Sequence, residues 1–279
     1  MSERASLRVP APGTGAVARL AFGLGATPAA VAIASLTFPS LRVGEHTGAA
    51  LAFAGATLFP ILGLALAATA ELPSARAMAC AAGAGLALLV SAWAPPSPCV
   101  TMLIVDTALV CMGWALGSSL GRRVQDAGHL LPACVVAASA DLTSLLSPEG
   151  PSHAIADSER ALSVLATWFP LPGGAALAPA LGLGDLLFMG LVFGVARAHR
   201  LPYLRCVVAC LIGTALAGLA AARFGIAIPA LVPIAAAVVL GIPRARQVKR
   251  ADRSAARLSM LIAGAIALAV FVRGYVLKR

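Results

Sequence analysis

The chain alternates between long apolar runs and short polar breaks. Proline, glycine or charged residues form most of the breaks, which is typical of loops between helices. The apolar runs have lengths near the ~20 residues that cross a bilayer as a helix, and they cover residues 14–38, 47–70, 75–95, 98–120, 127–147, 174–197, 201–222, 226–243 and 256–276. The pattern predicts an all-α polytopic membrane protein with about nine transmembrane helices.

The composition excludes an ordinary soluble domain. Hydrophobic residues make up 60% of the 279 positions and charged residues 11%, against about 45–50% and about 25% in soluble domains. The net charge is +10, but only 5% of residues are aromatic, and basic and aromatic positions do not interleave. We therefore expect the lipid bilayer, and no nucleic acid, as a partner.

The basic residues predict an orientation. The densest cluster is "RARQVKRADRSAAR" at residues 244–257, which we interpret as a cytoplasmic anchor, with a specific lipid or partner site as the alternative. A cytoplasmic N-terminus places fifteen of the 21 Lys and Arg residues on the cytoplasmic side. The composition is typical of a high-GC bacterium. These features predict an integral protein of the bacterial inner membrane whose connection 148–173 lies outside.

The same pattern divides the chain into segments. The connection 148–173 is predicted to contain a short amphipathic helix on the membrane surface, capped by Asp157. Its apolar positions at helical spacing are Ala161, Leu162, Leu165 and Trp168. The full division is an N-terminal tail (1–13), N-terminal transmembrane helices (14–125), a transmembrane region carrying the polar motifs (126–243), the basic loop (244–257) and an additional C-terminal helix (258–279).

Three aspartates fall inside predicted spans: Asp106, Asp141 and Asp185. A carboxylate at this depth costs at least ~2.5–3.5 kcal/mol, so a functional role is the first hypothesis. The alternative for each is a protonated side chain that bonds a neighbouring helix, and this bridging role is our interpretation of Asp106. Asp141 lies about six residues before the end of its predicted helix, and Asp185 about eleven after the start of the next. An antiparallel pair of helices would bring the two to similar depth.

Two carboxylates that share a site do not ionise together, so they hold one proton between them. The ionised group can then take a proton from a water molecule while the protonated group polarises a peptide carbonyl. Gly182 and Gly184, on either side of Leu183, would let another backbone approach Asp185. The chemistry that this pattern indicates is peptide hydrolysis.

A third polar feature is "IPALVPIA" at residues 228–235. Pro229 and Pro233 each remove a backbone donor, which predicts either a broken helix or a simple kink. A broken helix beside the carboxylates would offer unpaired backbone groups to an extended substrate.

Four motifs follow one another along the second half of the chain: "DLTSLLSPEGP" from Asp141, "LGLGD" ending at Asp185, "VACLIG" at 208–213 and "PAL" at 229–231. Together and in this order they resemble the presenilin and signal peptide peptidase group of GxGD intramembrane aspartyl proteases. The resemblance, which is presenilin-like and covers residues 135–240, implies that Asp141 and Asp185 are catalytic. It also implies transmembrane helices of other membrane proteins as substrates, no cofactor and no metal. The residues implied to shape the site or bind substrate are Gly182, Leu183, Gly184, Pro229, Ala230 and Leu231.

The chain also departs from that family. Ala140 stands where the family usually has tyrosine, four predicted spans precede the Asp141 helix instead of five, and one additional span follows the PAL motif. The short connection lacks the insert that presenilin cleaves in itself. Its predicted position outside the cell matches signal peptide peptidase and inverts the presenilin arrangement.

Other functions fit parts of the pattern. Prepilin peptidases share GxGD but have a basic residue after it, which "GLGDLLF" lacks. A proton-coupled transporter or channel would also use intramembrane aspartates and broken helices, although no inverted repeat is visible. A catalytically silent relative would lose an aspartate. The four histidines show no metal-ligand spacing, so no metal site is predicted.

Overall fold

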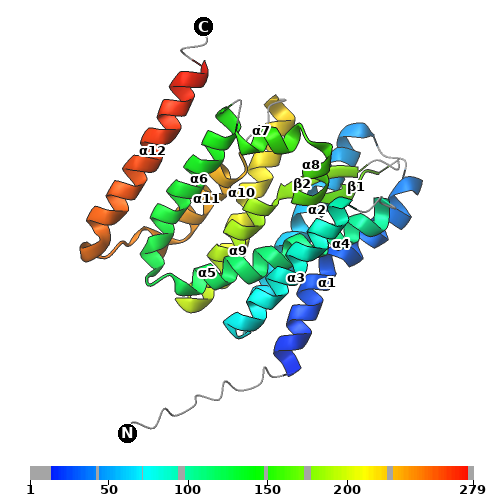
Figure 1. Cartoon of the computed structure of the whole chain (residues 1–279), viewed down its shortest axis with the longest axis horizontal. Helices are drawn as coiled ribbons and strands as arrows, with labels where there is room; N and C mark the ends of the chain where they lie inside the picture. The colour runs from blue at the N-terminus through cyan, green and yellow to red at the C-terminus, as the bar shows by residue number, and fades with distance from the viewer. Residues whose placement is uncertain are drawn as a thin grey trace.

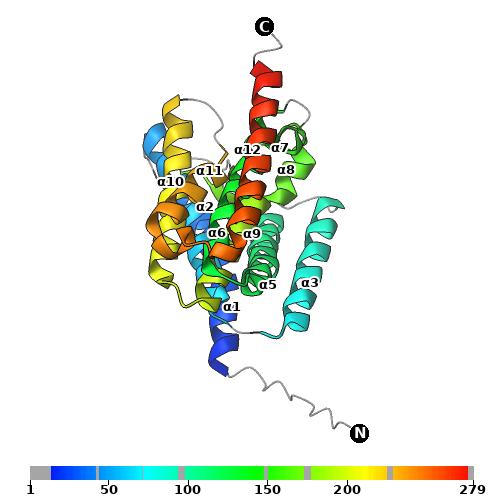
Figure 2. The ribbon, with the colours of Figure 1, turned by 90° about the vertical axis from the view of Figure 1, so that its left-hand side faces the viewer.

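The computed structural model describes residues 14–41, 44–70, 72–93, 98–147, 150–172, 177–224 and 229–275. Helices that run side by side make up most of the molecule, and a short β-hairpin lies toward one end (Figure 1). The first turn of α1 and the last turn of α12 lie at opposite ends of the bundle in both ribbon views (Figures 1 and 2). α12 lies at one edge of the bundle, where it packs against α6.

In chain order, the elements are mostly helices, and two strands lie among them. The helices are α1 (Thr14–Thr37), α2 (Glu45–Ala68), α3 (Ser74–Trp93), α4 (Pro98–Met112), the π-helix η2 (Gly113–Gly117), α5 (Ser118–Arg123), α6 (Leu130–Leu146), α7 (Pro151–Ala156), α8 (Glu159–Leu165), α9 (Leu183–Ala198), α10 (Tyr203–Phe224), α11 (Leu231–Gly241) and α12 (Arg253–Tyr275). Short 3-10 turns are η1 (Phe38–Ser40), η3 (Ala127–His129), η4 (Pro243–Arg246) and η5 (Arg250–Asp252). The two strands are β1 (Ala166–Pro170) and β2 (Leu177–Gly182).

Seven helical stretches among the described residues are long and apolar enough to cross a membrane. They confirm a predominantly helical fold, and at seven of the nine predicted runs the helices have the length and apolarity of membrane-spanning helices. The other two runs contain shorter helices, α9 with 16 residues and α11 with 11. At 1.5 Å per residue these reach only about 24 Å and about 17 Å, against a hydrocarbon core of about 30 Å. The count of nine spanning helices is therefore not confirmed.

The structure corrects the predicted amphipathic helix of the connection 148–173. Its helical part is divided into α7 and α8, and the side chain of Ser158, not Asp157, caps α8 by accepting a bond from the Ala161 amide at 3.2 Å. Trp168 lies on β1. Threonine, tryptophan and phenylalanine in succession favour a strand once a partner strand is present, and β2 supplies that partner.

The predicted helix over 174–197 is also wrong in its first part. Residues 177–182 form β2, and the helix begins only at Leu183. Pro179 explains the difference, because proline biases the residue before it toward extended backbone and lacks the amide that a helix needs. The basic loop is also shorter than predicted, since α12 begins at Arg253.

Glycines at four-residue spacing join α9 to the α4–η2–α5 stretch. A Cβ built on Gly117 would lie 2.4 Å from the Leu187 carbonyl oxygen, and one on Gly190 would lie 2.1 Å from the Gly113 carbonyl oxygen. Such backbone-to-backbone approach is how small residues pack membrane helices. The sequence reasoning missed this contact, although glycines at 113, 117 and 121 and at 190 and 194 carried the signal.

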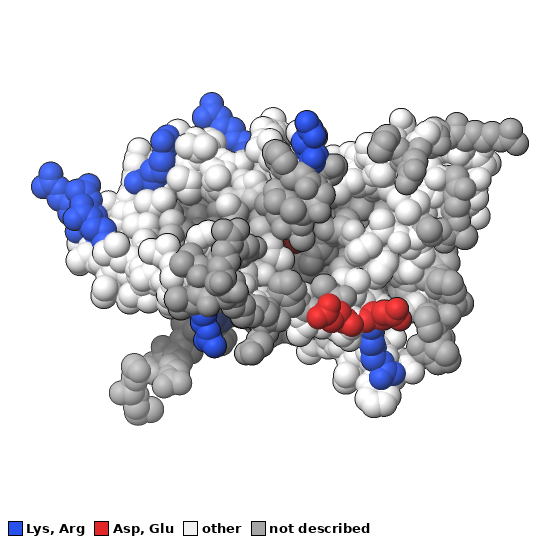
Figure 3. Space-filling model, turned by 90° about the horizontal axis from the view of Figure 1, so that it is seen from above, with Lys and Arg blue, Asp and Glu red and all other residues white. Residues whose placement is uncertain are grey.

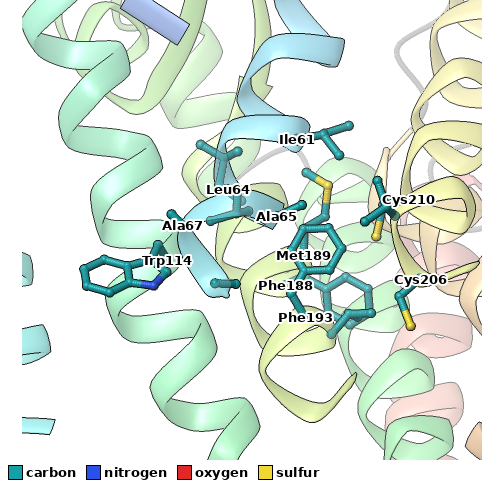
Figure 4. Close-up of a cluster of buried hydrophobic side chains, with 14 of the residues drawn as sticks. Ile61, Leu64, Ala65, Ala67, Trp114, Phe188, Met189, Phe193, Cys206 and Cys210 are labelled. Atoms are coloured by element: carbon teal, nitrogen blue, oxygen red, sulfur yellow. The ribbon is translucent and has the colours of Figure 1, made fainter. Parts of the chain in front are cut away.

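The other face of α9 is covered by large apolar side chains. Figure 4 shows Phe188, Met189 and Phe193 of α9 between side chains of α2, which include Ile61, and the α10 cysteine Cys210. All of these side chains are buried. α9 is therefore fixed by close backbone contact on one face and by a side-chain core on the other.

The hairpin is anchored on both of its strands. β1 and β2 are antiparallel, and a bulge at Thr167 is closed by its hydroxyl, which accepts a bond from the Leu181 amide at 3.1 Å. Phe169 of β1 is buried beside α1 and α2, with its ring centroid 5.8 Å from that of Phe38 and 6.4 Å from that of Phe59. The position of the hairpin is therefore fixed by the core, as it must be if it positions a site.

Candidate active site

α6 presents Asp141 to the start of α11. The Asp141 side chain is half-buried, and its Oδ2 accepts a hydrogen bond from the Leu231 amide at 3.0 Å. Amides in the first turn of a helix have no partner within that helix, so the carboxylate satisfies one of them. The first aspartate and the last residue of the PAL motif, 90 positions apart, thus belong to one site.

Asp185 lies in the first turn of α9, directly after β2. Its Oδ2 accepts a hydrogen bond from the amide of Gly182, the residue before the helix, at 3.0 Å. This is the acidic half of a capping box, and negative charge is favoured at this end of a helix. The prediction that Asp185 lies about eleven residues inside a helix is wrong, because the residues before Leu183 form a strand.

The structure brings the two aspartates together. The carboxylates of Asp141 and Asp185 lie close enough to interact electrostatically, across the contact between α6 and α9. Each carboxylate uses Oδ2 for a backbone amide, and no described residue donates a hydrogen bond to either Oδ1. One oxygen of each is therefore available to a water molecule or a substrate, which general acid–base chemistry requires.

The glycines of the second motif border open space. Gly184 is exposed, and a Cβ built on it meets no described atom within 4 Å, while one on Gly182 meets only the Asp185 carboxylate, at 3.6 Å. Gly182 pairs with Ala166 of β1, but no described backbone lies within 4 Å of a Cβ built on either glycine. The approach of another backbone to Asp185 therefore stays a prediction. Leu183 between them packs against the core. No described residue fills the space that Gly184 faces.

We expect Gly184→Ala to reduce cleavage of a reporter peptide by at least about tenfold, because a displacement near 1 Å at a reacting centre can cost about 10²-fold. The added methyl group occupies the space next to Asp185 and meets no described atom within 4 Å. Thermal unfolding should therefore be unchanged or slightly higher, as alanine favours helix over glycine by about 1 kcal/mol. Activity and unfolding are measured on the same preparation.

Gly264→Ala in α12 is the control for that change, because its Cβ also meets no described atom within 4 Å. It should leave both activity and unfolding near wild type. Full activity in Gly184→Ala would show that the space beside Asp185 is not used by substrate.

The third motif differs from its prediction. α11 runs unbroken through Pro233, which lies in its first turn, where proline loses no helical hydrogen bond. The carbonyls of Pro229 and Ala230 accept bonds from the amides of Val232 at 3.3 Å and Ile234 at 3.2 Å. These groups are already paired, so the expected supply of unpaired backbone groups is not found here; residues 225–228 lie outside the described part.

The third intramembrane aspartate does not join the other two. Asp106 of α4 is fully buried, and its Oδ1 accepts a hydrogen bond from the Trp168 amide at 2.9 Å. Its Oδ2 has no partner among the described residues. Asp106 thus bridges two elements, but its described partner is an amide of the strand β1 and not the neighbouring helix expected from the sequence.

We expect Asp106→Ala to lower the free energy of unfolding by about 1–3 kcal/mol, because it leaves the buried Trp168 amide without an acceptor. Asp106→Asn keeps an acceptor oxygen at the same place and should unfold near the wild-type temperature. Thermal unfolding in detergent measures both. Equal destabilisation by the two substitutions would show that charge, and not the acceptor, is what α4 supplies.

Comparisons with protein-family models, curated proteins and solved structures gave no match to this chain. Within the described residues, no three His, Cys, Asp or Glu side chains come together as a group that could hold a metal ion.

Proposed function

We propose that the protein is an intramembrane aspartyl protease, which hydrolyses peptide bonds in transmembrane segments of other membrane proteins. The observation that carries the proposal is the meeting of Asp141 and Asp185 from two helices, each with one oxygen not bonded by described residues. Two carboxylates at membrane depth carry a large cost unless they have a function. The resemblance to presenilin-like proteases assigns the same two residues.

In the proposed reaction, the ionised carboxylate takes a proton from water as the water oxygen attacks the peptide carbonyl. The protonated carboxyl group donates a hydrogen bond to that carbonyl oxygen. As the C–N bond breaks, the proton taken from water passes to the leaving amine nitrogen. The amides of Leu231 and Gly182 hold the two Oδ2 atoms in place, which keeps both Oδ1 atoms directed at the reacting groups. No cofactor takes part.

The substrate must be extended before it is cut, because a helix hides its backbone carbonyls. Within the described residues, β2 pairs only with β1, and β2 ends at Gly182, three positions before Asp185. An apolar groove of about 740 Å³ runs beside β2, lined by its residues Ala178, Pro179 and Ala180 together with side chains of α2 and α10. A third strand added to β2 would lead an unwound substrate toward the carboxylates.

We further propose nine membrane crossings, with α9 and α11 as the short ones and β2 completing the crossing of α9. The N-terminus is then cytoplasmic in a bacterial inner membrane, and the connection containing α7 and α8 is outside. Figure 3 shows this end of the molecule, where most of the surface is uncharged, basic side chains are scattered toward the edges, and acidic side chains gather at one place beside a basic one. Substrate helices would then cross the membrane in the orientation that signal peptide peptidase prefers.

The proposal is tested with purified protein in detergent and reporter transmembrane peptides of both orientations. We expect mass spectrometry to find a cut inside the apolar segment, and an aspartyl-protease transition-state inhibitor to block it. A protein that cuts none of several peptides would contradict the proposal. Proton uptake into proteoliposomes, lost in the aspartate variants, would then support the proton-coupled transporter.

A further inference from the structure

A second concave site lies where the basic loop meets α12 and the first turn of α6, ten positions before Asp141. It is a pocket of about 440 Å³, and its lining joins arginines to apolar side chains. Its charged residues are Arg246, Arg253 and Arg257, and its apolar wall includes Leu131, Val248 and Met260. A cavity with cationic and apolar walls fits an amphipathic ligand, in which an anionic group is attached to an apolar part.

The carboxylates nearest to this pocket are already paired with other groups. Asp126 lies 2.9 Å from the Lys249 ammonium, and Asp252 lies 3.2 Å from the His129 ring. The Gly128 amide and the Lys249 ammonium hold the pKa of Asp126 below its usual range. No described carboxylate therefore neutralises the three arginines of the pocket.

The pocket is built into the fold and is not the accident of a loose loop. A Cβ on Gly128 would lie 2.3 Å from the Gln247 carbonyl oxygen, so the loop backbone packs directly on the turn before α6. Ala245 is fully buried, and the Arg253 Nε donates a hydrogen bond to the Val248 carbonyl at 3.2 Å. The guanidinium groups of Arg246 and Arg257, by contrast, have no hydrogen-bond partner among the described residues.

We propose that this pocket binds the phosphoryl headgroup of an anionic phospholipid. Guanidinium groups match phosphate oxygens with paired hydrogen bonds, and basic pockets between helices on the cytoplasmic side bind anionic headgroups. The acyl chains would lie along α12, whose residues Leu258, Leu261 and Ile262 are exposed next to the pocket. The bound lipid joins α12 to α6, the helix that carries Asp141.

The experiment uses the full chain in a neutral detergent and measures lipid binding by native mass spectrometry. Phosphatidylglycerol is compared with phosphatidylcholine, and inorganic phosphate is added as a separate competitor. The pocket variant is Arg246→Gln with Arg257→Gln, because neither side chain bonds a described residue. The matched control is Arg244→Gln with Arg250→Gln, which removes the same charge from the basic loop at two positions that do not line the pocket.

We expect the wild type to retain phosphatidylglycerol at least about tenfold more tightly than phosphatidylcholine, which corresponds to about 1.4 kcal/mol. The pocket variant should lose this preference and the control should keep it. A variant with lysine at 246 and 257 should retain part of it, because the charge remains while the paired hydrogen bonds are lost.

Three results would overturn the proposal. An equal loss in the pocket variant and the control would show that only the overall charge of the loop attracts lipid. Equal binding of the two lipids by the wild type would show that no headgroup site exists. Displacement of the lipid by millimolar inorganic phosphate, with tight binding of phosphate itself, would assign the pocket to a free anion.

Discussion

Asp141→Asn and Asp185→Asn are each expected to lower cleavage of a transmembrane reporter by about 10²–10⁴-fold, the contribution typical of a positioned general acid or base. Asparagine keeps the side-chain volume and an oxygen that accepts the Leu231 or Gly182 amide bond. It cannot take a proton from water or donate one from oxygen. The loss should therefore be one of rate, measured as product per unit time at saturating peptide, with unfolding unchanged.

Asp106→Asn is the matched control, because it makes the same change at another intramembrane aspartate. It should cleave near the wild-type rate, since its carboxylate only accepts the Trp168 amide. The double variant with Asn at 141 and 185 should be no slower than the slower single variant, because groups that act as a unit have non-additive effects. A single variant that keeps most of the wild-type rate would contradict a shared dyad.

Apolar periodicity made the aspartates visible but could not sort them. Asp106, Asp141 and Asp185 give the same signal, a carboxylate in an apolar run, because periodicity gives the depth of a residue and not the direction in which it faces. The order of the motifs separated Asp141 and Asp185 from Asp106, but only by resemblance. The fold supplies the physical reason: α6 and α9 bring two of them together, while α4 turns the third toward β1.

The hairpin was not predicted, for a physical reason. "ATWFP" and "LAPALG" are too short for periodicity to separate strand from helix, and each becomes a strand only through pairing with the other. Pro179 argued against a helix at residues 174–182. The helix was predicted there because the whole apolar run has the length of a membrane span. The long helices were predicted well because about 20 apolar residues in a bilayer have few other solutions.

A joint loss of stability and activity is expected from Gly190→Ala. The added Cβ would lie 2.1 Å from the Gly113 carbonyl oxygen, and both partners are backbone, so α9 and η2 must move apart. Overpacking of this kind costs about 1–3 kcal/mol. Because α9 also carries Asp185, a shift near 1 Å should lower cleavage by about 10²-fold as well. Thermal unfolding in detergent and reporter cleavage measure the two losses.

Gly184→Ala separates this effect from any general cost of alanine in α9. It makes the same change six residues earlier on the same helix, at a position where a Cβ meets nothing within 4 Å. We expect Gly190→Ala to lose stability and activity together, and Gly184→Ala to lose activity alone. Wild-type unfolding of Gly190→Ala would mean that α9 does not pack on η2 as described. The position of Asp185 opposite Asp141 would then lose its structural support.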